Sequence, residues 1–209
     1  MNVNEIVGKY RLVPVIKIDS PSQAKPLAEA LVKGGLPIAE VTFRTDAAAD
    51  SIKEMHEAFP ELCIGAGSLT TLDQCKEAYW GGASFFVSAG YSEKIADFAD
   101  ENSIPYFPGI ATPTEIMRAL SHDYKVLKFF PAEQLGGIPM IKAISAPFPG
   151  LKFMPTGGIN KDNVAEYLKC DKVFAVGGSW MVPGKLMAEG KYDEIEKLIK
   201  DTMASISTI

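Results

Sequence analysis

The chain has 209 residues, of which 47% are hydrophobic and 22% are charged. These values are typical of folded globular proteins and exclude a disordered, collagen-like or low-complexity chain. The formal net charge is −5, with 21 Lys and Arg against 26 Asp and Glu. Since no long basic run offsets this charge, we expect no nucleic-acid partner.

All hydrophobic stretches of the chain are short. No stretch reaches the ~18 consecutive apolar residues of a membrane span, and the start of the chain has no signal-peptide pattern. We therefore expect no membrane contact and a cytoplasmic location. Cys63, Cys75 and Cys170 are odd in number and far apart. This spacing predicts reduced thiols that pack in the core, without a disulfide framework or a zinc site.

Short apolar runs alternate with longer segments of helical spacing: 12–18, 38–43, 62–66, 85–87, 105–108, 126–130, 152–156 and 173–177. Such runs, rich in Val, Ile and Phe, are typical of parallel strands that are covered by helices. Because eight strand–helix units close into a barrel, we predict an α/β fold, a single-domain (β/α)₈ TIM barrel over residues 1–209. An open doubly wound sheet is the alternative, because it uses the same alternation.

Capping patterns mark the starts of three predicted helices. They are Ser20-Pro21-Ser22-Gln23, Thr71-Leu72-Asp73-Gln74 and Thr112-Pro113-Thr114-Glu115. In each, a hydroxyl side chain stands three residues before Gln or Glu, which is the spacing of a capping box. The segment from about Lys185 to Ile206 is predicted to form one closing helix.

Polar side chains occupy positions of two strands where a barrel is expected to be apolar. Glu40, Thr42 and Arg44 share one face of the second run, and the alternate residues are apolar. Since the outward face of a barrel strand packs on helices, we predict that the polar set points inward. Lys128 lies within the apolar sixth run, which predicts a lysine buried in the barrel.

A buried lysine and glutamate need a reason, because burying an uncompensated charge costs several kcal/mol. A structural ion pair is one reason. The other is catalytic: burial disfavours the ammonium, so Lys128 can attack a carbonyl as the free amine. In that case Phe129, Phe130 and Pro131 are expected to provide dry surroundings and Arg44 a neighbouring positive charge. Glu40 is then expected to act as the base.

Glycine pairs follow the last two predicted strands, in Pro155-Thr156-Gly157-Gly158 and in Gly177-Gly178-Ser179-Trp180. Phosphate sites of these barrels are commonly built from the loops after strands seven and eight, where glycine N–H groups face the anion. We therefore predict a phosphate site there. Gly65-Ala66-Gly67 predicts no dinucleotide site, because Thr70 stands where the fingerprint needs its third glycine.

Five motifs together identify a resemblance over nearly the whole chain: Glu40-Val41-Thr42-Phe43-Arg44-Thr45, Gly65-Ala66-Gly67-Ser68, Lys128-Phe129-Phe130-Pro131-Ala132-Glu133, Pro155-Thr156-Gly157-Gly158 and Gly177-Gly178-Ser179-Trp180. In order and spacing they resemble the bacterial 2-keto-3-deoxy-6-phosphogluconate (KDPG) and 4-hydroxy-2-oxoglutarate (KHG) aldolases. The resemblance implies a class I, Schiff-base aldolase without a cofactor, usually a homotrimer. Its reaction is cleavage of KDPG to pyruvate and D-glyceraldehyde 3-phosphate, or of KHG to pyruvate and glyoxylate.

The same resemblance implies the roles of individual residues. Lys128 is expected to form the imine with the C2 carbonyl, and Glu40 to act as general acid and base through water. Arg44, Ser68, Thr156 and Phe130 are expected to bind the pyruvyl end of the substrate, with Lys17 as a further anion contact. The phosphate is expected to bind Gly157, Gly158, Gly178 and Ser179.

The chain departs from the family pattern at two places. Ser68 stands where the family more often has threonine, which keeps the hydroxyl. Ser88-Ala89-Gly90 replaces a more usual Ser-Pro-Gly. The preference among KDPG, its C4 epimer 2-keto-3-deoxy-6-phosphogalactonate and KHG therefore stays open.

Three other functions use the same residues differently. In a phosphate-binding synthase or epimerase, Lys128 merely holds an anion, and a catalytically silent sugar-phosphate binding protein needs no imine. A metal-dependent aldolase needs metal ligands, but His56 and His122 are the two histidines and no HxH or HExxH spacing occurs. We therefore expect no metal site and treat both histidines as ordinary surface residues.

Overall fold

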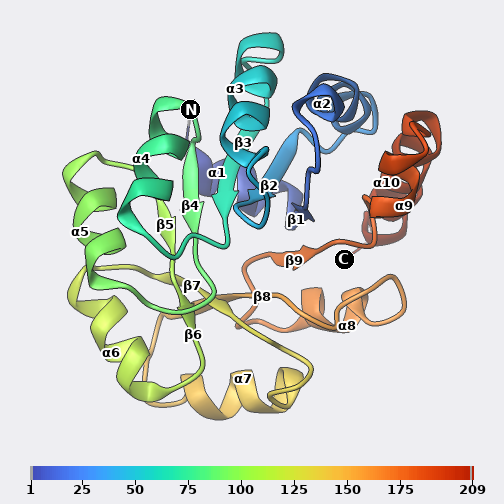
Figure 1. Cartoon of the computed structure of the whole chain (residues 1–209). Coiled ribbons are helices and arrows are strands. Elements are labelled where there is room, and N and C mark those ends of the chain that lie inside the picture. Colours follow the sequence, from blue (N-terminus) through green and yellow to red (C-terminus); the bar gives the residue numbers. More distant parts are fainter. Residues whose placement is uncertain (1, 208) are drawn as a thin grey trace.

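Parallel strands form a closed ring at the centre of the molecule (Figure 1). The computed structural model describes residues 2–207 and residue 209. The strands are β1 (Leu12–Ile16), β2 (Ile38–Thr42), β3 (Cys63–Gly67), β4 (Phe85–Val87), β5 (Tyr106–Phe107), β6 (Gly109–Ile110), β7 (Val126–Phe129), β8 (Lys152–Pro155) and β9 (Val176–Gly178). Each predicted apolar run thus contributes to a strand.

The order of the strands closes the barrel. One sheet has the order β5-β4-β3-β2-β1-β9 and the other the order β6-β7-β8. Parallel bridges from Phe153 to Val173 and from Thr156 to Gly177 join β8 to the segment of β9. The predicted barrel is confirmed, and the open sheet is excluded. Gly65-Ala66-Gly67 lies inside β3 and not in a turn before a helix, as a dinucleotide fingerprint requires.

Pro108 divides the fifth barrel strand into β5 and β6. β5 pairs with β4, and β6 pairs with β7. Proline has no N–H to donate to a ladder, so the chain changes its partner at this residue. The Pro108 carbonyl still accepts a hydrogen bond from the Lys128 N–H, at 2.9 Å. One barrel strand therefore bridges the two sheets.

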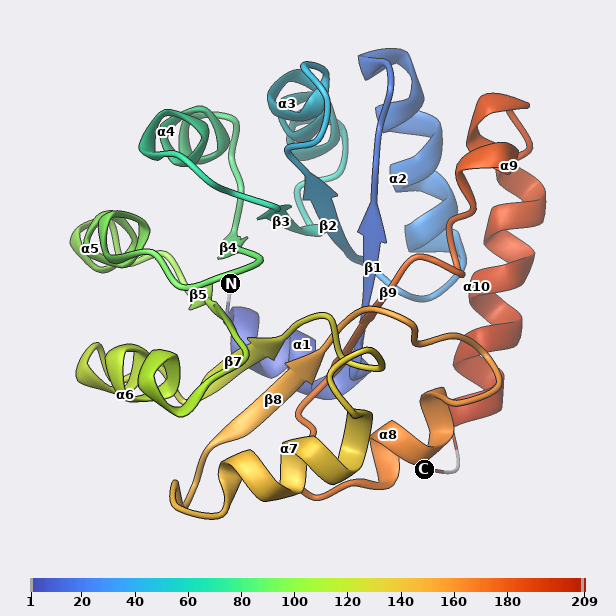
Figure 2. The ribbon, with the colours of Figure 1, turned by 60° about the horizontal axis from the view of Figure 1, so that its bottom comes forward.

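A ring of helices surrounds the strands (Figure 2). The helices are α1 (Val3–Tyr10), α2 (Ala24–Lys33), α3 (Ala48–Ala58), α4 (Leu72–Trp80), α5 (Glu93–Glu101), α6 (Pro113–Ser121), α7 (Gly137–Ser145), α8 (Val164–Lys169), α9 (Gly184–Ala188) and α10 (Tyr192–Ile206). Capping boxes at Thr71 and Thr112 begin α4 and α6, as predicted. The predicted box at Ser20 begins a 3₁₀ turn, Pro21–Gln23, which leads into α2.

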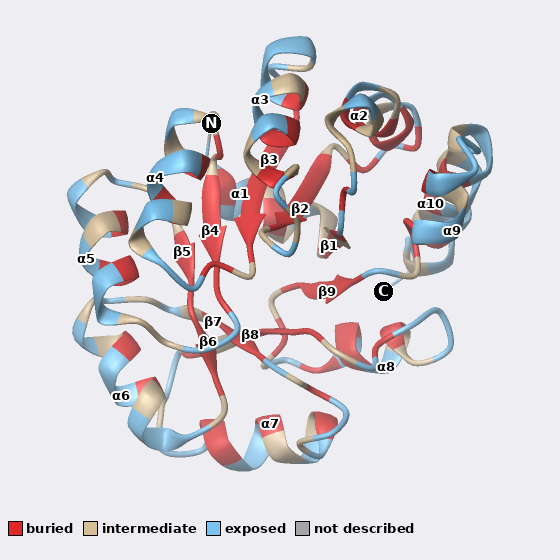
Figure 3. Cartoon of the chain, viewed as in Figure 1, coloured by how far each residue is buried: buried red, intermediate tan, exposed pale blue. Residues whose placement is uncertain are grey.

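The residues of the strands are mostly buried, whereas each helix buries only the face that points toward the strands (Figure 3). The three cysteines are buried free thiols, as predicted. Burial raises the pKa of Cys63 to about 12 and that of Cys75 to about 11. Both thiols therefore stay protonated at neutral pH and serve as small apolar side chains.

The structure differs from the predicted elements at both ends of the chain. The closing segment forms two helices, because Gly190 adopts a φ of +68° between α9 and α10 and turns the chain. The last strand begins at Val176, three residues later than predicted. Helix α1 was not predicted, although Asn2 caps it by accepting a hydrogen bond from the Glu5 N–H. The predicted boundaries 1–209 include residues 1 and 208, which lie outside the described part.

Among the described residues, no helix combines the length and the apolar composition that a membrane crossing needs.

Candidate active site

Lys128 and Glu40 meet inside the barrel. Lys128 lies in β7 opposite Gly109 and Met154, and Glu40 lies in β2 opposite Gly65. The Lys128 Nζ donates a hydrogen bond to the Glu40 Oε1 at 3.2 Å. The lysine side chain is 5% exposed and the glutamate side chain is 0% exposed. The inward direction predicted for both residues is therefore correct.

Gly67 makes room for the Glu40 carboxylate. A Cβ at Gly67 would lie 2.2 Å from Glu40 Oε1 and 2.5 Å from its Cγ. Any side chain larger than hydrogen at Gly67 would therefore push the carboxylate away. The other carboxylate oxygen, Oε2, is buried and has no hydrogen-bond partner among residues 2–207 and 209. Since a buried, unpaired carboxylate oxygen is costly, this atom is available to accept from a substrate or a water.

Phe129 and Phe130 follow Lys128 along the chain and lie on different faces of it. The Phe130 ring centroid lies 5.6 Å from the Lys128 Nζ, within reach of a cation–π contact, and the Phe130 residue is 37% exposed. Phe129 alternates with Lys128 along the strand, so it points to the opposite face, where its ring packs on Phe153. Phe129 therefore packs behind the strand as a buried residue, and Phe130 is the phenylalanine that lies beside the amine.

Arg44 lies just beyond β2 and is exposed. Its Nε donates to the Thr42 Oγ1 at 3.1 Å, and that hydroxyl donates to the Ile16 carbonyl at 2.9 Å. The ion-pair partner of Lys128 is Glu40. A positive charge from Arg44 near the amine, which required the two strands to bring it close, stays a prediction.

Ser68 and Thr156 follow β3 and β8 at the carboxyl ends of the strands. Ser68 adopts a φ of +57°, a region that non-glycine residues rarely occupy and that is concentrated at functional sites. The Thr156 Oγ1 is buried and has no hydrogen-bond partner in the described part of the chain. A Cβ at Gly177 would lie 2.3 Å from this oxygen, so that glycine leaves space for the hydroxyl. Thr156 can therefore donate to a ligand.

Gly157 and Gly158 follow β8, whereas Gly177 and Gly178 are the last residues of β9, so the second predicted loop begins only at Ser179. Gly157 and Gly158 adopt φ values of +103° and +77°, which favour glycine. Gly178 is covered by the Trp180 ring, because a Cβ at that glycine would lie 1.8 Å from a ring atom. The bridge between Thr156 and Gly177 places the start of the first glycine loop beside the end of β9. Ser179 and Gly158 are exposed and accessible to an anion.

Lys17 directly follows β1, so it lies at the same end of the barrel as the loops above. Its ammonium pairs with Asp19, and both side chains are more than half exposed. An exposed pair of this kind contributes little to stability. An anion that binds Lys17 would therefore have to compete with Asp19.

Comparisons with known proteins decide the family. The family model "KDPG and KHG aldolase" matches residues 3–198 of the chain. The chain belongs to this family. It is 38% identical over 209 residues to the 2-dehydro-3-deoxy-phosphogluconate aldolase of Treponema pallidum, which covers 100% of both chains. It is 41% identical over 192 residues to the KHG/KDPG aldolase of Escherichia coli, covering 92% of this chain and 90% of the relative.

A solved structure supports the same family. The KDPG aldolase of Legionella pneumophila, crystallised with pyruvate captured at low pH as a covalent carbinolamine intermediate, superposes with a TM-score of 0.92. The two chains are 39% identical, over 97% of this chain and 98% of the other. Relatives named as aldolases are carbon–carbon lyases, so the predictions of the family and of an aldolase are confirmed.

Two residues of the aldolase that lie beside the Gly157–Gly158 loop, Glu133 and Tyr167, have no role among those predicted from the sequence. The Tyr167 hydroxyl donates a hydrogen bond to the Glu133 carboxylate. Glu133 belongs to the motif that begins at Lys128, which is a signal that the sequence offered. Tyr167 carries no such signal, because only the packing of α8 brings it to the loop.

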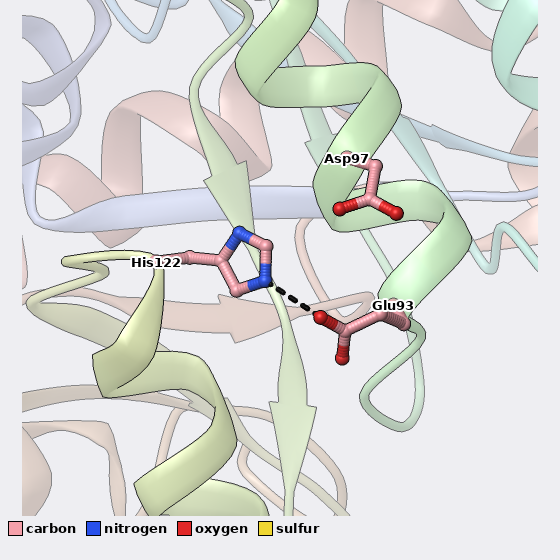
Figure 4. A group of neighbouring side chains, drawn as sticks. All are labelled: Glu93, Asp97 and His122. Atoms are coloured by element: carbon pink, nitrogen blue, oxygen red, sulfur yellow. Dashed lines mark hydrogen bonds and ion pairs between the residues drawn. The ribbon is translucent and has the colours of Figure 1, made fainter.

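A cluster of titratable groups lies away from the barrel centre, between α5 and the end of α6. Potential metal-ligand atoms of Glu93, Asp97 and His122 lie within 4.8 Å of one another (Figure 4). The His122 Nε2 is 2.9 Å from Glu93, and its Nδ1 is 2.7 Å from Asp100. Because both ring nitrogens are engaged by carboxylates, we assign the cluster as an ion-pair group.

His122 is thus more than the ordinary surface residue that was predicted. Its side chain is 14% exposed, and its ring stacks on Tyr124 with a centroid distance of 5.6 Å. His56 is exposed, as predicted. Hydrogen bonds to Asp100 and then to Glu93 raise the pKa of His122 above its ordinary value of 6.5. The same histidine lowers the pKa of Glu93.

We expect His122→Gln to lower the melting temperature by about 2 °C at pH 6 and by less at pH 9. Because the His122 pKa is raised in the folded state, its stabilisation is complete below about pH 6.5 and is lost as the pH rises through the raised pKa. Thermal melts of both proteins across this range measure the difference. His56→Gln is the matched control, and an equal loss at both pH values would contradict the ion-pair assignment.

Proposed function

We propose that the protein is a class I aldolase that cleaves KDPG to pyruvate and D-glyceraldehyde 3-phosphate and also KHG to pyruvate and glyoxylate, in one domain spanning 1–209. The observation that carries this proposal is the buried contact of 3.2 Å between Lys128 Nζ and Glu40 Oε1. An amine beside a carboxylate, inside a barrel, has both groups that imine chemistry needs: a nucleophile and a proton acceptor.

Imine formation begins with a proton transfer from the Lys128 ammonium to Glu40, directly or through a water. The free amine then attacks the C2 carbonyl of the substrate, and the carbonyl oxygen takes up a proton to give a carbinolamine. Glu40 protonates the departing hydroxyl, which leaves as water, and the nitrogen lone pair forms the C=N bond. The unpartnered Glu40 Oε2 supports this shuttle, because it can hold a water or a substrate hydroxyl.

Cleavage uses the same two residues. Glu40, through a water, removes the proton of the C4 hydroxyl, the C3–C4 bond breaks, and its electron pair moves into the imine to form an enamine. The aldehyde leaves. Protonation at C3 and hydrolysis of the imine then release pyruvate and regenerate the amine. The positively charged imine supplies the electron sink, so these residues need no cofactor or metal for the step.

Substrate binding divides between two ends of the site. Arg44, Ser68, Thr156 and Phe130 are proposed to hold the pyruvyl end, with Lys17 as a further anion contact. The Arg44 Nε donates a hydrogen bond to Thr42 at the end of β2. From this position the guanidinium would reach inward when the substrate binds. The buried, unpaired Thr156 Oγ1 supports its assignment as a donor. Gly157, Gly158, Gly178 and Ser179 are proposed to bind the phosphate.

The assembly and location are also proposals. The family resemblance supports a homotrimer in the cytoplasm, with a small-molecule sugar phosphate as partner and no nucleic acid. Sedimentation of the purified protein measures the assembly, and a monomer or dimer would contradict the trimer.

Alternatives remain within the same scaffold. The C4 epimer, 2-keto-3-deoxy-6-phosphogalactonate, differs at one stereocentre, and a synthase or epimerase would use Lys128 as an anion contact only. Release of pyruvate from KDPG, from its C4 epimer and from KHG, compared by kcat/KM, tests the proposal. We expect turnover of KDPG and KHG. Preference for the epimer would reassign the substrate, and absence of pyruvate from all three would contradict an aldolase.

We expect Ser179→Asp to raise the KM for KDPG on the order of 10- to 100-fold and to change the KM for KHG much less. The new carboxylate would repel the phosphate group, which KHG does not carry. Steady-state kinetics with both substrates measure this ratio. Ser179→Asn is the matched uncharged control. Equal effects on the two substrates would contradict the placement of the phosphate at this loop.

A further inference from the structure

Two loops of the barrel are joined by backbone hydrogen bonds beyond the ends of their strands. The Ala132 N–H donates to the Thr156 carbonyl at 2.8 Å, and the Glu133 N–H donates to the Gly157 carbonyl at 3.1 Å. These bonds continue the pairing of β7 with β8, whose last paired residues are Phe129 and Pro155. The chain that carries Lys128 therefore runs directly along the first glycine loop.

The Glu133 side chain packs against that glycine loop. A Cβ at Gly158 would lie 2.6 Å from both the Cβ and the Cγ of Glu133. The Asn163 Nδ2 donates to the Gly158 carbonyl at 3.3 Å from another direction. Gly158 thus has the Glu133 stem on one side and a hydrogen bond from Asn163, the residue before α8, on another, and both contacts restrict its backbone.

Tyr167 fixes the far end of the Glu133 side chain. Its hydroxyl donates to the Glu133 Oε1, and the Tyr167 residue is 2% exposed, so the donor is immobilised in the core. Burial and the neighbouring Glu133 raise the pKa of Tyr167, which keeps the hydroxyl protonated. Gly137, the first residue of α7, leaves the space: a Cβ there would lie 2.9 Å from the Tyr167 Oη and 3.1 Å from the Glu133 Oε1.

The charge of Glu133 also needs an explanation. A carboxylate beside a loop that binds phosphate repels the ligand, so it opposes binding unless it has another function. The Tyr167 hydroxyl and the start of α7 both lie next to its Oε1, and these are groups that stabilise a negative charge. The carboxylate is therefore engaged on the helix side of the loop, where its position serves the geometry of the loop.

We propose that Glu133 and Tyr167 form a positioning pair that holds the Gly157–Gly158 backbone in its phosphate-binding conformation and ties this loop to the strand of Lys128. The inference rests on the proposed function, since it deepens the description of the phosphate end of that site. Neither residue needs to touch the substrate. The pair acts through the glycine backbone, because the Glu133 stem lies directly against Gly158.

Tyr167→Phe removes the hydroxyl and keeps the ring. We expect the KM for KDPG to rise about tenfold, with kcat for KDPG and both constants for KHG changed by less than about twofold. Glu133→Gln keeps the stem and an acceptor oxygen, so it should lose less than Glu133→Ala. Tyr124→Phe is the matched control, because it removes a hydroxyl that donates to Asp100 at 2.8 Å, away from the loop.

A second measurement separates this inference from the proposed function. Titration with inorganic phosphate, followed by calorimetry, needs no turnover. We expect Tyr167→Phe to raise the Kd for phosphate about tenfold and Tyr124→Phe to leave this Kd unchanged. If the wild-type protein binds phosphate but cleaves neither substrate, the aldolase proposal fails while the pair remains testable. An unchanged Kd and KM in Tyr167→Phe, with only a lower melting temperature, would overturn the positioning pair, as would a wild-type protein that binds no phosphate.

Discussion

Lys128→Ala is expected to lower kcat for KDPG and for KHG by at least about 10⁴-fold. No other amine is described in contact with Glu40, so nothing else can form the imine. The Lys128→Ala variant should fold. Alanine removes the positive charge of a buried pair, and the remaining Glu40 carboxylate can take up a proton. Release of pyruvate, measured with a coupled dehydrogenase, gives the rate, and circular dichroism verifies the fold.

Lys128→Arg is the matched control for charge. A guanidinium keeps the positive charge beside Glu40 but cannot supply the free amine of an imine. We expect this variant to be as inactive as the alanine variant. Activity of Lys128→Arg within about tenfold of the wild type would show that Lys128 only holds an anion, as in a synthase or epimerase.

Glu40→Gln is expected to lower kcat by about 10²- to 10⁴-fold while slow imine formation persists. An amide keeps the volume of the carboxylate and can still contact Lys128, but it cannot take a proton. Comparing the rate of pyruvate release with the rate of borohydride trapping measures the two steps separately. Turnover equal to that of the wild type would remove Glu40 from the mechanism.

Gly67→Ala tests the position of the same carboxylate without removing it. Because the added Cβ would lie 2.2 Å from the Glu40 Oε1, the carboxylate must move. We expect the kcat of Gly67→Ala to lie between that of the wild type and that of Glu40→Gln. The matched control is Gly184→Ala, because a Cβ at Gly184 meets none of the described atoms within 4 Å and Gly184, like Gly67, does not have a positive φ. An unchanged kcat in Gly67→Ala would show that catalysis does not depend on the distance between the Glu40 carboxylate and Lys128.

The barrel was predictable because its signal is local and repeated. Each strand is a short apolar run, and the alternation of inward and outward residues fixed the directions of Glu40 and Lys128. The same rule, applied strictly, places Phe129 behind its strand, where the structure has it on Phe153. Phe130, on the same face as Lys128, is the phenylalanine whose ring lies over the amine.

Features that depend on contacts between distant residues were not predictable. Tyr167 meets Glu133 only after α8 has packed, and His122 meets two carboxylates of α5 only after α6 has packed. The break at Gly190 follows from one backbone angle inside a segment of helical spacing. The position of Arg44, exposed at the end of β2, depends on where that strand stops, which sequence patterns define least well.

Trapping with pyruvate and borohydride tests most directly that the Lys128 amine forms a covalent bond with the keto acid. The protein is incubated with pyruvate, reduced, digested and analysed by mass spectrometry. A reduced pyruvyl adduct is expected on the peptide that contains Lys128, with none in Lys128→Arg treated in the same way. An adduct on a different lysine, or no adduct on the wild-type protein while pyruvate release continues, would contradict the imine.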